Sequence, residues 1–218
     1  MNNTLRHFGL IPDGTRRWAQ ENNYNLFDAY MLTMNKISAF LNTLFEQDVL
    51  VVSVYLLSTE NLKRIPEHLD PVIDTEIFMF EKLLPTVVEQ NDVQVIHAGK
   101  SDLLPVNYQK ALSVLCSKNN KNTKKRLYLL AAYNPIDEIK IAINKSGEKT
   151  FDVSSLLVPE LLDLVVRSSG ESRLSNFLPL QAGYAELIIE PKHFNDLKRE
   201  DVYQYLAEFN RRKRRFGQ

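Results

Sequence analysis

Short apolar segments alternate with longer amphipathic segments along this chain, and this alternation constrains its fold more than any other feature. A strand that is buried on both faces is apolar at every position, whereas a strand with one wet face alternates between apolar and polar residues. Strand character is found at residues 6–11, 50–57, 93–98, 127–132, 163–167 and 186–189, and helical periodicity at residues 26–45, 71–88, 106–115 and 135–144. The pattern predicts an α/β fold with a central, mostly parallel sheet flanked by helices.

Size and composition indicate a single domain over residues 1–218. The chain is 44% hydrophobic, which suffices for one core, and it contains no repeat or low-complexity linker. Its 27 Lys and Arg residues balance 27 Asp and Glu residues, so no overall charge favours nucleic acid or an anionic membrane. Residues 117–125 are rich in Lys, Asn and Ser and are predicted to form an exposed loop.

The cysteine content and the longest apolar run bear on location. Cys116 is the single cysteine, which rules out an internal disulfide and a cysteine-based zinc site. We therefore expect a cytoplasmic protein. The longest apolar run, residues 49–57, is too short to cross a bilayer, so we expect no stable membrane insertion.

The sequence DGTRRW (residues 13–18) directly follows the first predicted strand. Gly14 lets the backbone approach an oxyanion, a following helix would offer free N–H groups, and Arg16 and Arg17 can bind phosphate oxygens. A carboxylate in this setting would repel phosphate unless Mg²⁺ lay between them, so Asp13 is interpreted as a metal ligand. A helix-capping aspartate followed by two solvated arginines would give the same pattern.

A second polar cluster, STENLKR (residues 58–64), follows the second predicted strand. Ser58, Glu60 and Asn61 could orient a substrate or transfer a proton, and Arg64 could hold a phosphate. An ordinary strand-to-helix turn with polar caps explains the same residues. The carboxyl ends of parallel strands are where such folds place ligands, which keeps the functional interpretation open.

A third cluster, RSSGESRLSNF (residues 167–177), follows the fifth predicted strand. Two arginines and several hydroxyls around one glycine suit a diphosphate. Glu186 then opens the last strand, where it is either a metal ligand or a salt-bridged edge residue. Three anion-binding strand ends and two carboxylates indicate an enzyme that acts on two phosphorylated substrates with Mg²⁺.

Five motifs occur in order: DGTRRWA (13–19), STENLKR (58–64), RSSGESRLSNF (167–177), YAEL (184–187) and NRRKRRFG (210–217). Together they resemble the cis-prenyltransferases, the undecaprenyl diphosphate synthase family, over essentially the whole chain. The resemblance implies a cytosolic homodimer whose subunits each have one α/β domain. It also implies a hydrophobic tunnel between the sheet and two long helices.

The resemblance further implies roles for single residues. Asp13 would coordinate Mg²⁺ on an allylic diphosphate, and Glu186 would complete the metal site near the subunit interface. Ser58 and Asn61 would assist proton removal. The basic run at 211–215 would reach the partner subunit's site, although a solvated helix end explains it equally well. The implied contacts of the allylic diphosphate are Gly14, Arg16, Arg17 and Arg64, those of the second diphosphate are Arg167, Arg173 and Ser175, and further predicted substrate contacts are Thr15, Trp18, Tyr30 and Thr59.

Three departures from the family pattern bear on the substrates. Thr15 replaces an asparagine and Tyr30 replaces a histidine, both of which the family ties to binding and deprotonating isopentenyl diphosphate. Pro179-Leu180-Gln181 replaces a Leu-Trp-Gln ending. A similar DGxRRW motif, a tyrosine at the histidine position and a Pro-Leu pair are found in the cyclolavandulyl and lavandulyl diphosphate synthases. That subgroup joins two dimethylallyl diphosphates head to middle.

We therefore expect a Mg²⁺-dependent prenyl diphosphate synthase that makes a C10 irregular monoterpene diphosphate from two dimethylallyl diphosphates. Leu56, Leu57 and the large residues of 78–83 are expected to limit the length of the product, although ordinary core residues would show the same spacing. The terminating base stays open among Glu60, Asn61, Tyr30 and the departing diphosphate.

Two alternatives remain. A regular short-chain synthase that uses isopentenyl diphosphate would explain why residues 58–61 and Arg64 match the family. A non-catalytic partner subunit is the other alternative, and Asp13, Arg16 and Arg17 argue against it because accessory members of the family typically lose these residues.

Overall fold

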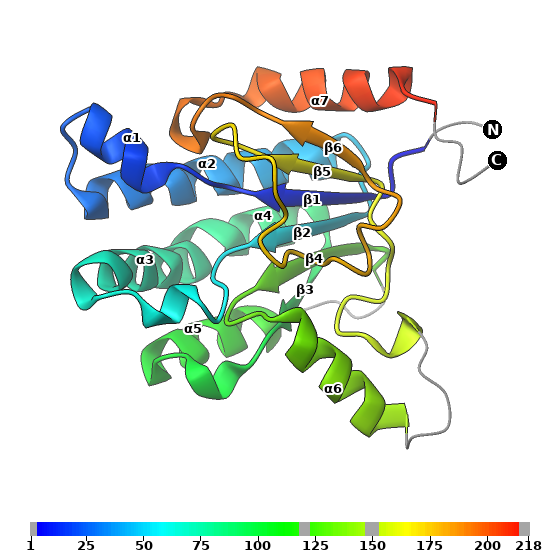
Figure 1. Cartoon of the computed structure of the whole chain (residues 1–218), viewed down its shortest axis with the longest axis horizontal. Helices are drawn as coiled ribbons and strands as arrows, with labels where there is room; N and C mark the ends of the chain where they lie inside the picture. Colours follow the sequence, from blue (N-terminus) through cyan, green and yellow to red (C-terminus); the bar gives the residue numbers. More distant parts are fainter. Residues whose placement is uncertain (1–3, 118–122, 147–152, 214–218) are drawn as a thin grey trace.

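Six strands form one sheet in the computed structural model, which describes residues 4–117, 123–146 and 153–213 (Figure 1). Their order is β3-β4-β2-β1-β5-β6, and every neighbouring pair runs parallel. The parallel α/β sheet and all six predicted strands are thereby confirmed. The strands are β1 (His7–Ile11), β2 (Val51–Tyr55), β3 (Val93–Ala98), β4 (Lys125–Leu130), β5 (Leu164–Arg167) and β6 (Glu186–Ile189).

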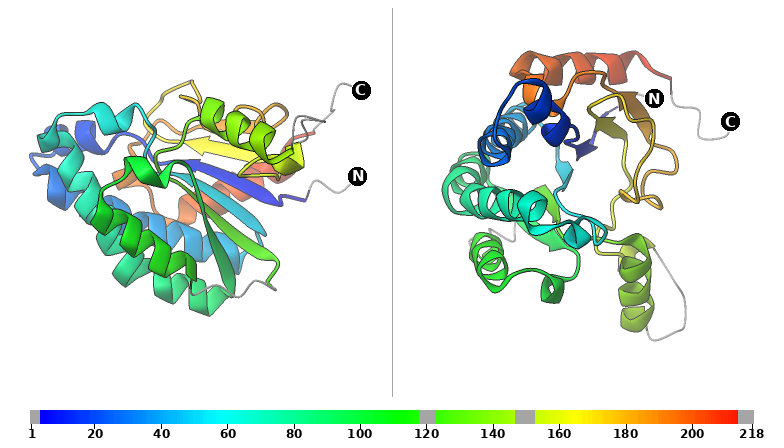
Figure 2. Two further views of the ribbon diagram at one scale, coloured as in Figure 1. Left: turned by 90° about the horizontal axis from the view of Figure 1, so that it is seen from below. Right: turned by 60° about the vertical axis from the view of Figure 1, so that its left-hand side comes forward.

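Helices cover the two faces of the sheet unequally (Figures 1 and 2). Helices α2, α4, α5 and α7 enclose the main hydrophobic core on one face. Helix α6 lies on the other side (Figure 2), where loop residues of 156–162 and 174–185 form a second core. The helices are α1 (Thr15–Glu21), α2 (Leu26–Glu46), α3 (Pro66–Phe78), α4 (Leu84–Asn91), α5 (Val106–Ser117), α6 (Pro135–Ser146) and α7 (Arg199–Arg211).

Strand β1 shows why the strand segments are apolar at nearly every position. Phe8 and Leu10 belong to the main core, whereas Ile11 belongs to the second core on the opposite face. Gly9, between Phe8 and Leu10, lets the ring of Phe177 pack directly against the strand, because a Cβ at this position would collide with that ring. Burial on both faces leaves no position on β1 for a polar, solvent-facing side chain.

The chain path places a ligand crevice beside β1. After β1 the chain adds β2, β4 and β3 on one side, and it later returns to add β5 and β6 on the other side. Strands β1 and β5 are therefore neighbours in space, with Leu10 opposite Val166, although they are far apart in sequence. In open α/β sheets, ligands bind at the carboxyl ends of the strands where the order reverses in this way.

The helices differ from the prediction in two places. The segment predicted as one helix at 71–88 begins earlier and consists of α3, a widened π-helical turn at Met79–Leu83 and α4. Pro85 explains the widened turn, since it has no N–H for the carbonyl four residues before it and its ring crowds that carbonyl. Helix α7 was not predicted from the sequence. Its apolar stripe is narrow, because its only buried apolar residues are Val202, Tyr205 and Phe209.

The remaining expectations about the chain concern a loop and the membrane. Most of the loop predicted at 117–125 lies outside the described residues. No helix in the described ranges is long and apolar enough to cross a bilayer.

Candidate active site

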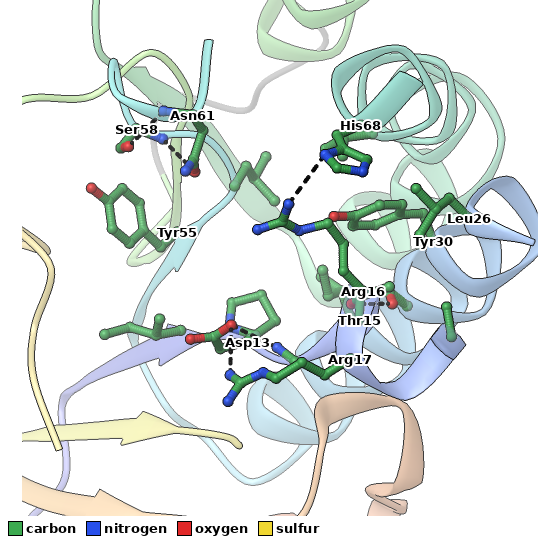
Figure 3. A pocket seen from close by; sticks show the side chains of 18 of the residues that line it. Asp13, Thr15, Arg16, Arg17, Leu26, Tyr30, Tyr55, Ser58, Asn61 and His68 are labelled. Carbon is green, nitrogen blue, oxygen red and sulfur yellow. Dashed lines mark hydrogen bonds and ion pairs between the residues drawn. The ribbon is translucent and has the colours of Figure 1, made fainter. Parts of the chain in front are cut away.

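A cavity of about 820 Å³ opens at the carboxyl ends of β1, β2 and β5, and α1, α2 and α3 contribute its other walls (Figure 3). Its volume is typical of sites for small ligands. The three predicted polar clusters therefore meet in one place. The predicted site residues that line the cavity are Asp13, Gly14, Thr15, Arg16, Arg17, Tyr30, Ser58, Asn61, Arg64, Arg167, Arg173 and Ser175.

The loop between β1 and α1 is fixed by the segment after β5. The Oγ atom of Ser168 accepts from the Asp13 N–H and donates to the Asp13 carbonyl, each at 2.8 Å. Gly14 has a φ of 103°, and a Cβ there would collide with Ser169 and the ring of His193. Only glycine fits this position without strain, because L side chains rarely adopt a positive φ and this site has no space for one.

The Asp13 carboxylate lies among cationic side chains. Its Oδ2 accepts from the Arg167 guanidinium at 2.6 Å, and Arg17 lies 3.5 Å from Oδ1. Burial alone would raise the pKa of the Asp13 carboxyl, but the hydrogen bond and charge of Arg167, with a contribution from Arg17, hold it below its ordinary value. Asp13 is therefore ionised at neutral pH, as a metal ligand must be.

The donor set around Asp13 fits Mg²⁺ but not a metal site made of protein ligands alone. No group of three or more His, Cys, Asp or Glu side chains gathers within the described ranges. Mg²⁺ commonly binds through one or two carboxylates, with waters and substrate phosphates as its remaining ligands. The ionised Asp13 at the cavity wall can supply such a carboxylate.

Arg167 joins the two predicted diphosphate regions. Its side chain is only 6% exposed, and besides Asp13 it donates to the Ser175 hydroxyl at 2.9 Å and to the carbonyl of Arg173. Among the described residues, the buried Nε of Arg167 has no hydrogen-bond partner. Arg167 therefore holds the segment after β5 against the end of β1.

The other arginines differ in how far they are neutralised. Glu171 accepts from Arg17 at 2.7 Å and also pairs with Arg173. Within the described part of the chain, neither Arg16 nor Arg64 forms an ion pair, and both line the cavity. These two guanidinium groups are the ones that can bind a diphosphate without first breaking a salt bridge.

Tyr30 and Thr15, which the resemblance places at the positions of a histidine and an asparagine of the family, both line the cavity. The Tyr30 side chain extends into the cavity beside Arg16 (Figure 3). Burial raises the pKa of the Tyr30 phenol, although Arg64 and Arg16 oppose this, so the group is neutral at physiological pH. The Thr15 hydroxyl lies 2.9 Å from that of Thr33 and is engaged with α2.

Ser58 and Asn61 line the cavity as a mutually bonded pair (Figure 3). The Asn61 N–H donates to the Ser58 hydroxyl at 3.1 Å, and the Ser58 N–H donates to the Asn61 side-chain oxygen at 3.2 Å. This pairing is the capping arrangement that the sequence left as an alternative. Because both side chains still border the cavity, capping and substrate contact are compatible.

Two predicted residues of the second cluster lie outside the cavity lining. Asn134 donates to the Thr59 hydroxyl at 3.3 Å and to the Glu60 carboxylate at 3.2 Å. Glu60 is exposed. Burial raises the pKa of its carboxyl, but hydrogen bonds from its own N–H, Ser58 and Thr59 together hold that pKa below its ordinary value. A solvated carboxylate of low basicity, away from the cavity, is poorly placed to remove a substrate proton.

Trp18 and Glu186 are also away from the cavity. Trp18 packs on Tyr24 with ring centroids 4.8 Å apart and donates to Asp196 at 2.7 Å, so its contacts are structural. Glu186 begins β6, so it lies at the amino end of that strand, whereas Asp13 lies beyond the carboxyl end of β1. Its carboxylate pairs with Arg212 at 2.9 Å. This is the salt-bridged edge residue that the sequence left as an alternative. Glu186 does not join Asp13 within one chain, and the rest of the basic run, from residue 214, lies outside the described residues.

The structure corrects the predicted closure of the cavity. None of residues 78–83 lines it: Phe78 is 38% exposed, and Phe80 is buried in the main core. Of the two predicted leucines, Leu56 lines the cavity and Leu57 is buried in the main core. The apolar wall is formed by Leu56 together with Met34, Ile37 and Val72.

Two residues on α3 were missed by the sequence analysis. His68 and Glu76 line the cavity on the same face of α3 as Val72. The missed signal is their spacing of four residues, which puts all three side chains on one face of the helix. Placing the helix start at Pro71 hid this spacing, because the observed helix begins at Pro66.

Comparison with known proteins gives a consistent result. The family model described as "Putative undecaprenyl diphosphate synthase" matches residues 11–217. An isoprenyl transferase of Streptococcus pyogenes serotype M6 is 30% identical over 97% of this chain and 92% of its own length. A tritrans,polycis-undecaprenyl-diphosphate synthase (GGDP specific) of Sulfolobus acidocaldarius is 34% identical over 97% of this chain and 87% of its own length.

Two solved structures share the fold over 100% of both chains. Lavandulyl diphosphate synthase from Lavandula x intermedia, in complex with dimethylallyl diphosphate, superposes with a TM-score of 0.92 at 25% identity. A probable undecaprenyl diphosphate synthase from Campylobacter jejuni superposes with a TM-score of 0.81, also at 25% identity.

Proposed function

The chain belongs to the undecaprenyl diphosphate synthase family of prenyltransferases, and we propose that it joins two molecules of dimethylallyl diphosphate head to middle. The product would be a C10 irregular diphosphate, lavandulyl or cyclolavandulyl diphosphate. The similarity to a lavandulyl diphosphate synthase in complex with dimethylallyl diphosphate supports this choice of substrate.

The observation that carries the proposal is the tyrosine at position 30, in the wall of the cavity. The regular reaction of the family depends on a histidine at this position, and this chain presents a buried phenol whose pKa is raised by burial. A neutral phenol does not accept a proton at physiological pH. The hydroxyl of Thr15, at the position of the family's asparagine, is engaged with Thr33. Both positions tied to isopentenyl diphosphate have therefore lost their chemistry.

The apolar wall of the cavity supports a short product. Met34, Ile37 and Val72 are at most 3% exposed and belong to the main core, so they have little freedom to move aside. A lengthening hydrocarbon chain would collide with these side chains and with Leu56.

The residues fit an ionisation mechanism. The allylic carbon–oxygen bond breaks, and its electron pair leaves with the diphosphate, whose charge Arg16 and Arg64 can neutralise. When bound, Mg²⁺ held through Asp13 adds Lewis-acid stabilisation of the departing group. The apolar wall keeps water from the cation until the second alkene attacks it. Arg173 and Ser175 would hold the diphosphate of that second molecule.

A regular short-chain synthase that uses isopentenyl diphosphate is the second candidate. Ser58, Asn61 and Arg64 all line the cavity, as that reaction would need. The relatives named isoprenyl transferase and undecaprenyl-diphosphate synthase fit this candidate equally well.

Product analysis distinguishes the two candidates. The protein is incubated with Mg²⁺ and dimethylallyl diphosphate, with or without isopentenyl diphosphate, and the dephosphorylated products are identified by mass spectrometry. We expect a C10 alcohol from dimethylallyl diphosphate alone, matching a lavandulol or cyclolavandulol standard, and none after chelation of Mg²⁺. Product formation only with isopentenyl diphosphate would refute head-to-middle coupling and support the second candidate.

A further inference from the structure

Glu76 is a carboxyl group buried in the wall of the cavity, and the proposed reaction has not yet used it. The residue lies on α3, one turn after Val72, and is only 1% exposed. Tyr108 of α5, itself fully buried, donates its hydroxyl to Oε2 of Glu76 at 2.5 Å. Within the described residues this is the one hydrogen bond that the Glu76 side chain makes, which leaves Oε1 without a partner on a residue that lines the cavity.

The surroundings of Glu76 make it a basic carboxyl. Burial raises its pKa to about 8, and the hydrogen bond from Tyr108 and the charge of Arg64 only partly oppose this rise. Tyr30 of α2 also interacts electrostatically with Glu76, and Arg16 and Asp13 act on Tyr30 from the cavity mouth. An ordinary carboxyl would be too weak a base near neutral pH, whereas a general base works best when its pKa lies near the operating pH.

We propose that Glu76 is the catalytic base that removes the terminating proton. The inference rests on the proposed head-to-middle reaction. In that reaction, the π electrons of the second molecule form a bond from its C2 to C1 of the allylic cation, which leaves a tertiary cation at C3. A C–H bond of a methyl group on C3 then breaks, its electron pair becomes the new double bond, and the proton passes to Oε1 of Glu76. The products are the C10 diphosphate, inorganic diphosphate and a neutral carboxyl group.

Geometry and chemistry separate Glu76 from the other carboxyl groups near the cavity, from Asn61 and from the departing diphosphate. Glu60 lies outside the cavity lining, and the amide of Asn61 is not basic. Asp13 and Glu171 line the cavity but are paired with arginines. The departing diphosphate is expected at the arginine-rich mouth. Glu76 follows apolar Val72 on the helix, so its carboxyl lies where the hydrocarbon of a substrate is expected.

The first test is Glu76→Gln, which preserves shape and an oxygen that can accept from Tyr108. We expect turnover per folded molecule to fall by about 10²- to 10⁴-fold, the usual contribution of a positioned base. We also expect part of the residual product to be a hydroxylated C10 compound, because a cation that keeps its proton can be captured by water.

The second test is the pH dependence of kcat, which a purely structural role would not produce. In the wild-type protein kcat should rise with pH, reach half its maximum near pH 8, where half of the Glu76 carboxyls are ionised, and level off at higher pH. Tyr108→Phe removes the hydrogen bond that lowers the pKa of Glu76, so the rise should move to higher pH. The rise should be missing from Glu76→Gln.

Glu138→Gln is the matched control. Glu138 is also a 1% exposed carboxyl that accepts from a tyrosine, Tyr133, but it lies outside the cavity lining. This variant should keep the wild-type product and pH profile, measured per folded molecule.

The outcomes also separate this inference from the proposed function. Product analysis of the wild-type protein is done first, and the substrates that it identifies are then used to assay all variants. If the wild-type protein requires isopentenyl diphosphate, head-to-middle coupling is refuted. With either substrate set, the role of Glu76 is refuted if Glu76→Gln keeps turnover within about threefold of wild type. An unchanged pH profile in Tyr108→Phe refutes it independently, even if Glu76→Gln does not fold.

Discussion

Single residues set the chemistry of the cavity, and the sequence predicted its polar mouth better than its apolar interior. Asp13, Arg16 and Arg64 were predicted because charged residues directly after apolar strands stand out. Glu76 was not, because a glutamate within a helix usually faces water. Only the packing of α3 against α2 and α5 shows that this side chain is buried.

Tyr30 determines, on our proposal, which second substrate is accepted. Tyr30→His combined with Thr15→Asn restores the two family residues tied to isopentenyl diphosphate. We expect this double variant to form a product that requires isopentenyl diphosphate and to lose at least about tenfold in coupling two dimethylallyl diphosphates. Mass spectrometry of dephosphorylated products measures both.

Tyr24→His is the control for that experiment. Tyr24 also lines the cavity but is 52% exposed at its rim. It should not gain a product dependent on isopentenyl diphosphate. An unchanged product pattern in the double variant would contradict the role given to these two positions.

Glu76 should also change how stability depends on pH. Its folded-state pKa of about 8 lies above the ordinary value of 4.5, so the folded state binds the proton more tightly than the unfolded state does. The stabilisation is complete below about pH 4.5 and is lost as the pH rises toward about 8, by at most about 1.4 kcal/mol per pH unit. Glu76→Gln should lack this loss.

Denaturant unfolding at several pH values measures this difference. The stability of Glu76→Gln relative to wild type should increase between about pH 5 and 8, where the Glu76 carboxyl of the unfolded wild-type chain ionises while that of the folded protein stays protonated. A difference that does not vary with pH would show that Glu76 is not a buried carboxyl with a raised pKa.

At the scale of elements, the strands were predictable and the course of α3 was not. A strand buried on both faces leaves a continuous apolar run, so all six strands could be located from sequence. The π-helical turn at Met79–Leu83 shifts the helix phase, which local periodicity does not reveal. Residues 78–83 were therefore expected to limit the length of the product, whereas the residues of α3 that line the cavity precede the turn.

The apolar wall formed by α2, α3 and the end of β2 should limit the size of the substrate. Leu56→Ala combined with Val72→Ala enlarges the cavity. We expect kcat/KM for geranyl diphosphate, relative to dimethylallyl diphosphate, to rise by about tenfold or more. Competition between the two substrates measures this ratio.

Phe78→Ala provides the control at the same scale. Phe78 was expected from sequence to close the cavity, but it is 38% exposed and does not line it. Its substitution should leave the substrate ratio unchanged. A larger effect from Phe78→Ala than from the double variant would show that the wall has been misassigned.

At the scale of the whole molecule, the predicted metal role of Glu186 would require a second copy of the chain. Glu186 lies at the amino end of β6, whereas Asp13 follows the carboxyl end of β1, so the two carboxylates meet only if a homodimer brings Glu186 to its partner's cavity. The sequence could place Glu186 at the start of a strand. It could not show that this strand lies two positions from β1 in the sheet.

Subunit complementation tests this arrangement. Asp13→Ala and Glu186→Ala should each be inactive alone if both carboxylates serve one metal site. After the two variants are mixed and allowed to exchange subunits, about a quarter of wild-type activity should return, because half of the dimers carry one complete site. Full activity of Glu186→Ala alone would refute its metal role, and the lack of any recovery on mixing would refute a shared site.

The pairing of Arg167 with Asp13 also has a consequence during synthesis. The two residues are 154 positions apart, and β5 must dock beside β1 before they can meet. At usual rates of translation, about 8 to 30 s separate their emergence from the ribosome. On our proposal, a nascent chain that carries only the first motif has no cavity in which to ionise an allylic diphosphate, so it would not expose a cation to water. The enzyme would then acquire reactivity and protection of its intermediate in the same late folding event.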